Sequence, residues 1–569
     1  MRIGSVVVYK GLLLALVSFY VFYALVGHIL FFVGSKAWFV CTFAYFIDSL
    51  SQLGGASEYV TSFILQYVHL EPVGALLLSI LSLAIYVVLT YLYRYLSQGS
   101  EDMLCLSLIP SAVLLSLSAS SEYDVAFGIA LLFSALVSYL YVEFRGCFKR
   151  AEKYVCLLTS ALLFLFCGKW FVLFLAVICV YSSAKDRLIY LGFSAFLPLI
   201  YAYWQVLPVG ECYMQFADKA LLYAVLFSFF FVMIARCMPY QNIQKPLCRV
   251  VSIVSLFFLF SVASYSFVKQ YNYKEKLMVL VEKHMNLSQW EELEKVARLY
   301  PSKNPLITYA FNLSLLKRDK LAEEILRYPQ SFGINGLMIG SEVSQQKNDY
   351  LHHLYAHLGI YNEAHRLIWE GTTVSGYNRI NLPYIVHYNA MMERPRIAAK
   401  FERLKNQTLR SDDFSINTDA ARASRAIDVA LSDSLPAKFV NIFNIGNDLN
   451  YLYTHAELSK PQADCLLLVL LLSNNVSGFA KYASLVKTYY PQKLPPIYDE
   501  ALVLLEAMLP KEDFNALGIC PSSEAKERYD SYVRVYKSSR GNARELMSFR
   551  STYFYYIQFI SPYGSEIRE

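Results

Sequence analysis

The residues of this sequence most suited to chemistry are acidic side chains in short connections between long apolar runs. Asp48 follows the first apolar run, and Glu122 and Asp124 stand two positions apart in the stretch SASSEYDVAFG. Carboxylates at this spacing can reach one divalent cation or one polar substrate. A carboxylate half-buried at a membrane interface has a raised pKa and can take a proton from an acceptor hydroxyl. We therefore identify Asp48, Glu122 and Asp124 as candidate catalytic residues.

A later connection contains a second polar group, Glu211, Asp218 and Lys219. The Lys219 cation could meet a phosphate, so we treat the three as candidate substrate-binding residues. No residue is assigned as a metal ligand and the cofactor is unknown, although the carboxylates are compatible with a divalent metal. A non-catalytic interpretation stays open for the acidic residues, because Asp and Glu are also favoured at helix N-termini.

Nine apolar runs must position these connections. A helix needs roughly 20 apolar residues to cross about 30 Å of hydrocarbon. The continuous Leu, Phe and Val runs do not alternate as barrel strands would, which predicts a helical bundle. The fifth and sixth runs are short enough to form one re-entrant hairpin. The runs are 11–34, 72–95, 103–120, 123–142, 154–167, 169–183, 188–206, 219–238 and 250–269.

The cations in the connections predict the orientation of this bundle. With a cytoplasmic N-terminus, the cytoplasmic stretches hold twelve Lys and Arg residues, and the outer ones hold only Lys36, Lys169 and Lys219. The first run is too long for a signal-peptide core and lacks a small-residue cleavage site, so it reads as a retained signal anchor. Residues 271–569 are then expected outside the cytoplasm.

Charge divides the chain into two regions. The whole sequence has 569 residues, 56% hydrophobic and 17% charged, with a mean hydropathy of +0.36. Residues 1–270 hold 16 Lys and Arg and 12 Asp and Glu, whereas residues 271–569 hold 35 and 33. We expect a transmembrane bundle over 1–270 and an extracytoplasmic domain over 271–569. The near balance of charge in both argues against a nucleic-acid partner.

The first outer connection, residues 36–70, is expected to form interfacial helices. Residues 56–70 are amphipathic, with an apolar face that includes Tyr59 and Phe63 and a polar face that includes Glu58 and Gln66. Such a helix prefers the membrane surface. Gly54-Gly55 should end the helix before it, and Pro72 stands where the next helix can begin.

The second region has the pattern of paired amphipathic helices. Its clearest pair is DYLHHLYAHLGIYNEAHRLIWEG at 349–371, with a break at Leu358-Gly359 and the small Ala364 where two helices cross. This is similar to a tetratricopeptide helix pair, and its irregular recurrence predicts an α-solenoid with a groove for a partner. The fold class is therefore all-α throughout.

Three further features of the second region allow expectations. His353 and His357 stand one helical turn apart, and we interpret them as surface histidines of a repeat helix rather than half of a metal site. Cys465 and Cys520 could pair in an oxidising compartment, but nothing in the sequence shows that they do. The aromatic stretch 553–559 is expected to be a final docking segment.

The layout of the membrane half looks like the GT-C glycosyltransferases, polytopic enzymes that use polyprenyl-phosphate sugars. In that superfamily the N-terminus is cytoplasmic, the first outer loop carries surface helices and a catalytic acidic residue, and the second often carries an acidic pair. Asp48 matches the first position, and Glu122 with Asp124 resembles the second. Asp48 departs from the pattern because it stands alone and lies further past the first span.

Most of the chain resembles a bacterial family of multi-pass inner-membrane proteins known only as a domain of unknown function. The resemblance is carried by GGASEYVTSFILQY (54–67), LGIYNEAHRLIWEG (358–371) and the stretch from LLLSNNVSGFAKY to LPPIYDEALVLLE (470–506). It implies a Gram-negative bacterium, so that the outer side would be the periplasm.

Two functions follow as competing hypotheses. The first is a GT-C-like transferase of the cell envelope that uses a polyprenyl-phosphate-linked sugar, with periplasmic repeats that bind the acceptor or a partner. The second is a non-enzymatic scaffold anchored in the membrane that recruits envelope-assembly partners through its groove. Nine spans exceed what an anchor needs, which favours the transferase. A transporter is disfavoured, because the spans hold few charges and no Gly/Pro-interrupted pair in matching halves.

Overall fold

The computed structural model describes residues 5–120, 124–148, 151–206, 208, 219–237, 245–300, 303–339, 347–409 and 445–563. The chain forms two compact units: unit 1 is Met1–Lys276 with Asn406–Arg410, and unit 2 is Leu277–Lys405 with Ser411–Glu569. Every regular element among the described residues is a helix, which confirms the expected all-α fold. The only extended pairing in these ranges is an isolated bridge between Val40 and Thr408.

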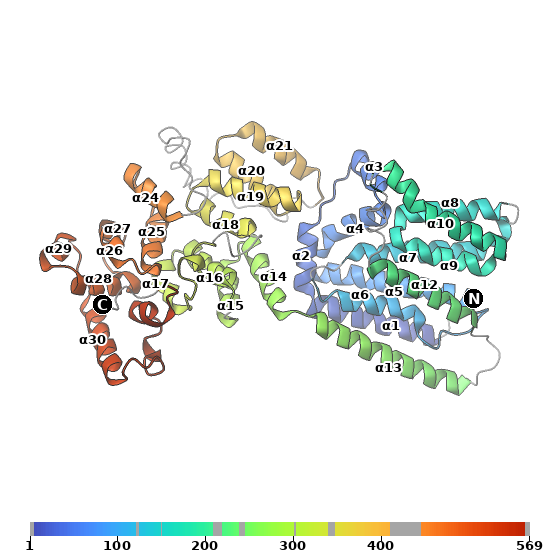
Figure 1. Cartoon of the computed structure of the whole chain (residues 1–569), viewed down its shortest axis with the longest axis horizontal. Coiled ribbons are helices and arrows are strands. Elements are labelled where there is room, and N and C mark those ends of the chain that lie inside the picture. The colour runs from blue at the N-terminus through green and yellow to red at the C-terminus, as the bar shows by residue number, and fades with distance from the viewer. Residues whose placement is uncertain are drawn as a thin grey trace. The chain divides into compact units, whose positions relative to one another are not determined.

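Unit 1 is a helical bundle (Figure 1), and most residues of its helix α9 are buried. Helix α5 packs on α7, α7 packs on α9, and α12 packs on both α5 and α9. The helices are α1 (Ser5–Tyr20), α2 (Gly27–Lys36), α3 (Phe43–Ser51), α4 (Gly55–Val68), α5 (Glu71–Leu96), α6 (Ile109–Leu117), α7 (Val125–Phe144), α8 (Glu152–Cys167), α9 (Phe171–Tyr181), α10 (Ala184–Trp204), α12 (Lys219–Cys237) and α13 (Lys245–Gln270).

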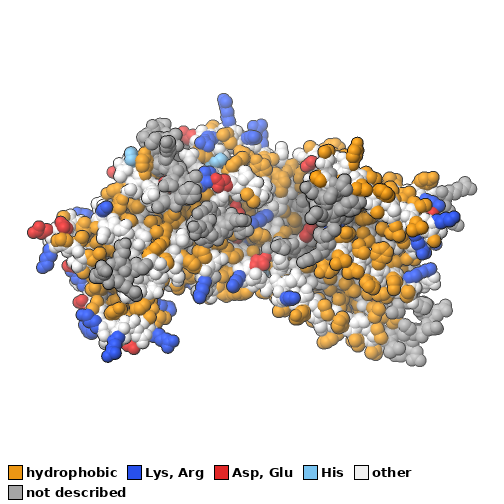
Figure 2. Space-filling model, in the orientation of Figure 1, with side chains coloured by type: hydrophobic (Ala, Val, Ile, Leu, Met, Phe, Trp, Pro, Cys, Tyr) orange, Lys and Arg blue, Asp and Glu red, His pale blue; other side chains and the backbone are white. Residues whose placement is uncertain are grey.

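Five segments in the described part of the chain are long and apolar enough to cross a membrane, which marks a membrane protein. They are Val6–Leu25, Glu71–Leu96, Val125–Cys147, Glu152–Tyr181 and Val250–Gln270. Leu106–Leu117 and Leu221–Cys237 are shorter apolar helices, and α10 is not among the five. The visible face of unit 1 is mainly hydrophobic, as expected for a surface that meets lipid (Figure 2).

The chain reverses direction at Gly168, inside the fourth of these segments. The Trp170 ring at the start of α9 contacts Phe127 near the start of α7, with ring centroids 4.9 Å apart. At the other end of α7, Arg145 lies 4.1 Å over the ring of Tyr181, the last residue of α9. Helix α9 therefore runs parallel to α7, and α8 runs antiparallel to both. The positive φ of Gly168 (+55°) permits the reversal between α8 and α9.

Unit 2 is built from consecutive packed helices. Helix α15 packs on α16, α18 on α19, α19 on α20, and α24 on α25. The helices are α14 (Tyr273–Asn286, which begins in unit 1), α15 (Trp290–Leu299), α16 (Pro305–Lys317), α17 (Leu321–Glu324), α18 (Lys347–His357), α19 (Tyr361–Ser375), α20 (Asn381–Met391), α21 (Pro395–Asn406), α24 (Ile445–His455), α25 (Lys460–Leu472), α26 (Val476–Ala480), α27 (Ala483–Tyr489), α28 (Pro496–Met508), α29 (Lys511–Ala516), α30 (Ser523–Ser538) and α31 (Tyr553–Tyr555).

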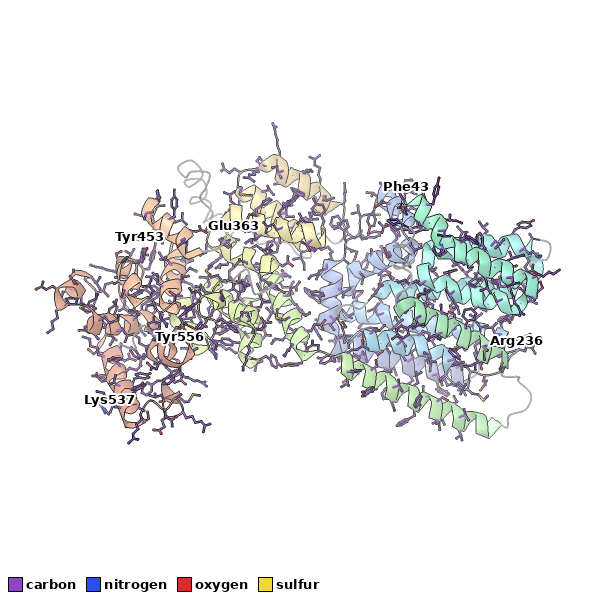
Figure 3. The ribbon with its side chains drawn as sticks, in the orientation of Figure 1. Phe43, Arg236, Glu363, Tyr453, Lys537 and Tyr556 are labelled. Atoms are coloured by element: carbon purple, nitrogen blue, oxygen red, sulfur yellow. The ribbon has the colours of Figure 1, made fainter. Side chains whose placement is uncertain are left out.

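The α18–α19 pair has the expected turn. Helix α18 ends before Gly359, whose φ of +75° allows the backbone N–H of Ile360 to donate to the carbonyl of Tyr355 at 2.9 Å. Ala364 is fully buried between the helices, as expected for a small residue at a crossing point. Beside it, the buried Glu363 accepts hydrogen bonds from Arg366 (Figure 3).

The C-terminal aromatic segment docks onto unit 2, as expected. Residues Tyr553–Ile557 are buried, and the Tyr556 hydroxyl donates to the carbonyl of Leu472 at 2.6 Å. Cys465 is buried in α25 while Cys520 is exposed, and both are free thiols. The disulfide that the sequence left open is therefore absent from the structure.

Candidate functional site

Asp124 caps the N-terminus of α7. Its backbone is extended, and its Oδ1 accepts a hydrogen bond from the N–H of Ala126 at 2.8 Å. This is the capping role that the sequence left open as an alternative to catalysis. The carboxylate is nevertheless exposed, so its second oxygen is accessible to a ligand.

Glu58, in the first turn of α4, is the electrostatic partner of Asp124. The Glu58 side chain is exposed, but the protein packed around its carboxyl still raises the pKa of that group, and the negative charge of Asp124 raises it further. Two carboxylates 66 positions apart in the chain are thus brought together by the packing of α4 on α7. A raised pKa beside a second carboxylate is typical of a general acid or base.

A tight turn before α4 positions Glu58. Gly54 has a φ of +78°, and its N–H donates to the carbonyl of Leu165 at the end of α8, at 2.7 Å. The end of α10 holds the same turn, because the Tyr201 hydroxyl accepts from the N–H of Leu53 at 3.2 Å. The expected break at Gly54-Gly55 is confirmed, and it serves to bring α3, α4, α8 and α10 together at one end of unit 1.

Gly55→Ala should destabilise this turn. A Cβ at position 55 would lie 1.8 Å from the backbone oxygen of Ser49, so the α3–α4 turn must open to accept it. We expect a loss of about 1–3 kcal/mol, measured as a lower melting temperature of the protein in detergent. Gly192→Ala in α10 is the control, because a Cβ there meets nothing within 4 Å. An equal effect of both substitutions would contradict this role of Gly55.

Helix α4 buries small and polar residues in the bundle together with Val68, and other aliphatic residues of the helix pack partly buried on the same core. Thr61 and Gln66 are buried, whereas Phe63 is 43% exposed. The Thr61 hydroxyl donates to the carbonyl of Ser57 at 2.6 Å, so its burial leaves no donor unsatisfied. Small residues allow helices to approach closely in membrane bundles. The aromatic residues of α4 pack instead on Phe39 and on α3.

Asp48 makes no described interaction with the Glu58–Asp124 pair. It is exposed on α3, and its carboxylate makes no hydrogen bond or ion pair with any residue in the described ranges. Helix α3 packs on α4 through aromatic rings, including Phe46 and Tyr59 at 5.1 Å. Phe43, at the start of α3, is 77% exposed (Figure 3).

The remaining predicted site residues have no described side chain. Glu122, Glu211 and Asp218 lie outside the described residues, and Lys219 begins α12 with its side chain outside them. The structure therefore brings together one predicted residue, Asp124, and one that sequence reasoning missed. The sequence feature that could have identified Glu58 as a site residue is its position in the first helical turn after Gly54-Gly55.

Unit 2 contains a buried cluster of histidines that the sequence did not predict. His353, expected on the surface, is 4% exposed, and its ring lies 4.1 Å from that of His352. The prediction was wrong because α18 is enclosed by neighbours on more than one side: Trp290 lies 6.1 Å from His353, and the Tyr388 hydroxyl lies 2.8 Å from Nδ1 of His352.

The cluster is electrostatically perturbed. Burial lowers the pKa of Lys317 to about 8, and its ammonium group lies 5.4 Å from the centroid of the Trp290 ring. Burial and the Lys317 charge lower the pKa of His352 and His357 to about 3 and that of His387 to about 4. The rings pack on one another, so we interpret the cluster as a buried, neutral core. No group of three His, Cys, Asp or Glu residues in the described ranges could hold a metal ion.

Comparison with known proteins identifies the family of the chain but no activity. Residues 3–560 match the model of a family described as a family of unknown function, DUF6057. No curated protein and no solved structure matches the chain. Function has to be argued from the site itself.

Proposed function

We propose that this chain, which belongs to the family of unknown function DUF6057, is a glycosyltransferase of GT-C type in the cell envelope. Its donor would be a polyprenyl-phosphate-linked sugar, and Glu58 would act as the general base with Asp124 beside it. Asp48, Glu122 and the Glu211–Lys219 segment remain candidate residues for catalysis and substrate binding on neighbouring connections.

The observation that carries this proposal is the Glu58–Asp124 pair. Helix packing places two carboxylates together at the end of the bundle where α4, the reversal at Gly168 and the end of α10 meet. The raised pKa of Glu58 brings its basicity closer to that needed for proton abstraction near neutral pH. The exposed oxygen of Asp124 is suited to hold a substrate hydroxyl or a divalent cation.

The reaction can be written from these groups. Glu58 takes the proton of an acceptor hydroxyl, whose oxygen forms a bond to the anomeric carbon of the donor sugar. The bond from that carbon to the lipid phosphate breaks, and the phosphate leaves with the electron pair. A cation near the phosphate stabilises this charge; Lys169, at the reversal between α8 and α9, and Lys219 are the basic candidates.

The proposed topology has nine membrane segments with a cytoplasmic N-terminus at the inner membrane. The antiparallel course of α8 and α9 is compatible with two separate segments, and a re-entrant hairpin would have the same course. The twelve-to-three distribution of loop cations supports the orientation. The Glu58–Asp124 pair and unit 2 would then both face the periplasm.

Unit 2 would present the acceptor or a protein partner as a tetratricopeptide-like solenoid. Its stacked helix pairs support this role, as does a polar groove of about 400 Å³. The groove is lined by Ala322, Glu323, Ile325, Leu326, Arg327, Pro496, Ile497, Arg528, Ser548, Phe549, Ser551 and Thr552.

Glu58→Gln should abolish transfer. In membranes that contain the full chain and an isotopically labelled polyprenyl-phosphate sugar, we expect the rate of sugar release to fall at least about 100-fold, because the base is removed. Asp124→Asn removes the charge that raises the pKa of Glu58, so the acidic limb of the pH–rate profile should move to lower pH.

Asp186→Asn is the matched control. Asp186 belongs to an ion pair with Lys153 at the other end of the bundle, so its loss should leave the rate unchanged. Wild-type rates in Glu58→Gln membranes at equal protein level would remove the transferase proposal.

The scaffold is the second candidate, favoured by the polar groove of unit 2. It predicts the opposite pattern in complementation of a deletion strain: Glu58→Gln remains functional, while Arg327→Glu, which reverses a charge on the groove wall, does not. A strain that Glu58→Gln fails to rescue at normal protein level would instead support the transferase.

A further inference from the structure

A groove of about 280 Å³ runs between α1 and α5 in unit 1. The two helices are joined there by a hydrogen bond from the Tyr86 hydroxyl to the carbonyl of Val7, at 3.3 Å. The wall is almost entirely apolar, with one cationic side chain, Arg94. The lining residues are Val7, Val8, Gly11, Leu12, Ala15, Leu83, Tyr86, Val87, Thr90, Tyr91 and Arg94.

Arg94 is a buried cation without a protein partner in the described part of the chain. It is only 8% exposed, and its guanidinium forms no hydrogen bond or ion pair with a described residue. Asp102 is an acidic residue near the Arg94 end of the groove. Its two carboxylate oxygens already accept hydrogen bonds from the backbone N–H groups of Leu106 (3.0 Å) and Ser107 (2.8 Å). The nitrogen atoms of Arg94 are not among the fully enclosed polar atoms that lack a partner, so an anion in the groove can reach the guanidinium and pair with it.

The groove is open to the surface that meets lipid. Val8 and Leu12 line it and are 55% and 59% exposed. Arg94 lies in the last turn of α5, the depth at which lipid phosphates are found when a helix spans the bilayer. From Arg94 to Leu83 the groove follows α5 for about 16 Å, at 1.5 Å per residue, toward the bilayer interior.

We propose that this groove binds an anionic glycerophospholipid. The guanidinium of Arg94 pairs with the phosphate, whose oxygens match its fork of N–H donors, and one acyl chain lies along the apolar wall. Arg94 is the one charged side chain among the lining residues, and its positive charge complements one anionic headgroup. The volume of the groove suits part of one acyl chain rather than a whole lipid.

This site is separate from the Glu58–Asp124 pair. Tyr95, beside Arg94, contacts Tyr139 in the last part of α7 with ring centroids 5.6 Å apart, whereas Asp124 caps the first turn of α7. The two sites therefore lie at opposite ends of α7. Lipid binding here does not depend on the transferase proposal.

Native mass spectrometry of the full chain in a neutral detergent tests the proposal. Titration with phosphatidylglycerol should give a bound lipid with at least tenfold higher affinity than phosphatidylcholine. Arg94→Gln should remove that preference, and Ala15→Phe, which fills the groove, should weaken binding of both lipids. Arg145→Gln is the matched control, since Arg145 is a cation at the same end of the bundle that lies over the Tyr181 ring instead.

Thermal unfolding separates lipid binding from misfolding. Without added lipid, Arg94→Gln should melt at or above the temperature of the wild type, because it removes an unpaired buried charge. Phosphatidylglycerol should then raise the melting temperature of the wild type and of Arg145→Gln, but not that of Arg94→Gln. Equal preference for phosphatidylglycerol in the wild type and Arg94→Gln, or tighter binding of a polyprenyl phosphate than of phosphatidylglycerol, would overturn the proposal.

Discussion

We expect Glu500→Ala to lower the free energy of unfolding of unit 2 by about 1–3 kcal/mol, because it leaves the buried backbone N–H of Tyr553 without its acceptor and removes one of the two carboxylates paired with Arg528. Glu500 is 1% exposed in α28. Its Oε1 accepts from Nη1 of Arg528 in α30 at 2.8 Å, and its Oε2 accepts from the backbone N–H of Tyr553 at 2.6 Å. One carboxylate therefore joins α28, α30 and the C-terminal aromatic segment. Hydrogen exchange of α28 and α30 amides in the full chain measures the loss.

Glu506→Ala is the matched control for this prediction. Glu506 and Lys526 form an ion pair of 2.7 Å between the same two helices, but their side chains are 41% and 45% exposed. Exposed pairs contribute less than about 1 kcal/mol, so exchange should change little. Similar losses in both variants would show that burial does not determine the strength of the Glu500 contact.

Acidification from pH 7 to pH 5 should destabilise unit 2. The pKa of His352 is about 3 in the folded protein against an ordinary value of 6.5, so the unfolded chain takes up the proton first. The stability that neutral His352 contributes is present above pH 6.5 and is lost as the pH falls below it. The expected loss at pH 5 is about 2 kcal/mol for this group. His353 acts in the same direction, because burial lowers its pKa as well.

Asp464 opposes this effect. Burial raises its pKa from 3.8 to about 6, although it accepts hydrogen bonds from Tyr490 and Tyr498. Its folded form therefore binds a proton more readily than its unfolded form, and acidification to pH 5 restores about 1 kcal/mol. The net effect of acidification on the stability of unit 2 is destabilising, because the buried histidines with lowered pKa values outnumber Asp464.

Three variants test the balance by hydrogen exchange of α18 amides at pH 7 and pH 5. His352→Gln should reduce the acid sensitivity by about 2 kcal/mol, and Asp464→Asn should increase it by about 1 kcal/mol. His455→Gln, at an exposed position at the end of α24, should leave it unchanged. Equal acid sensitivity in the wild type and His352→Gln would show that His352 is not held neutral by the fold.

Local patterns in the sequence determined the elements of this protein. The apolar runs and the uneven distribution of charge along the chain distinguish a membrane-spanning region from a polar helical one. A helix in lipid needs a long uncharged stretch regardless of which helices it packs against. Gly54-Gly55 and Leu358-Gly359 mark helix breaks, since glycine adopts positive φ without strain. The short fifth and sixth runs left the course of the chain between them open.

Only the tertiary structure decided which side chains meet. Glu58 and Asp124 are brought together by α4 packing on α7, and the enclosure of His353 depends on Trp290 and the histidine beside it. Arg94 reads in sequence as an ordinary loop-proximal cation, yet it is buried against α1. The reason is the same in each case: burial and electrostatic neighbours are set by packing between distant segments, which helical periodicity and composition do not encode.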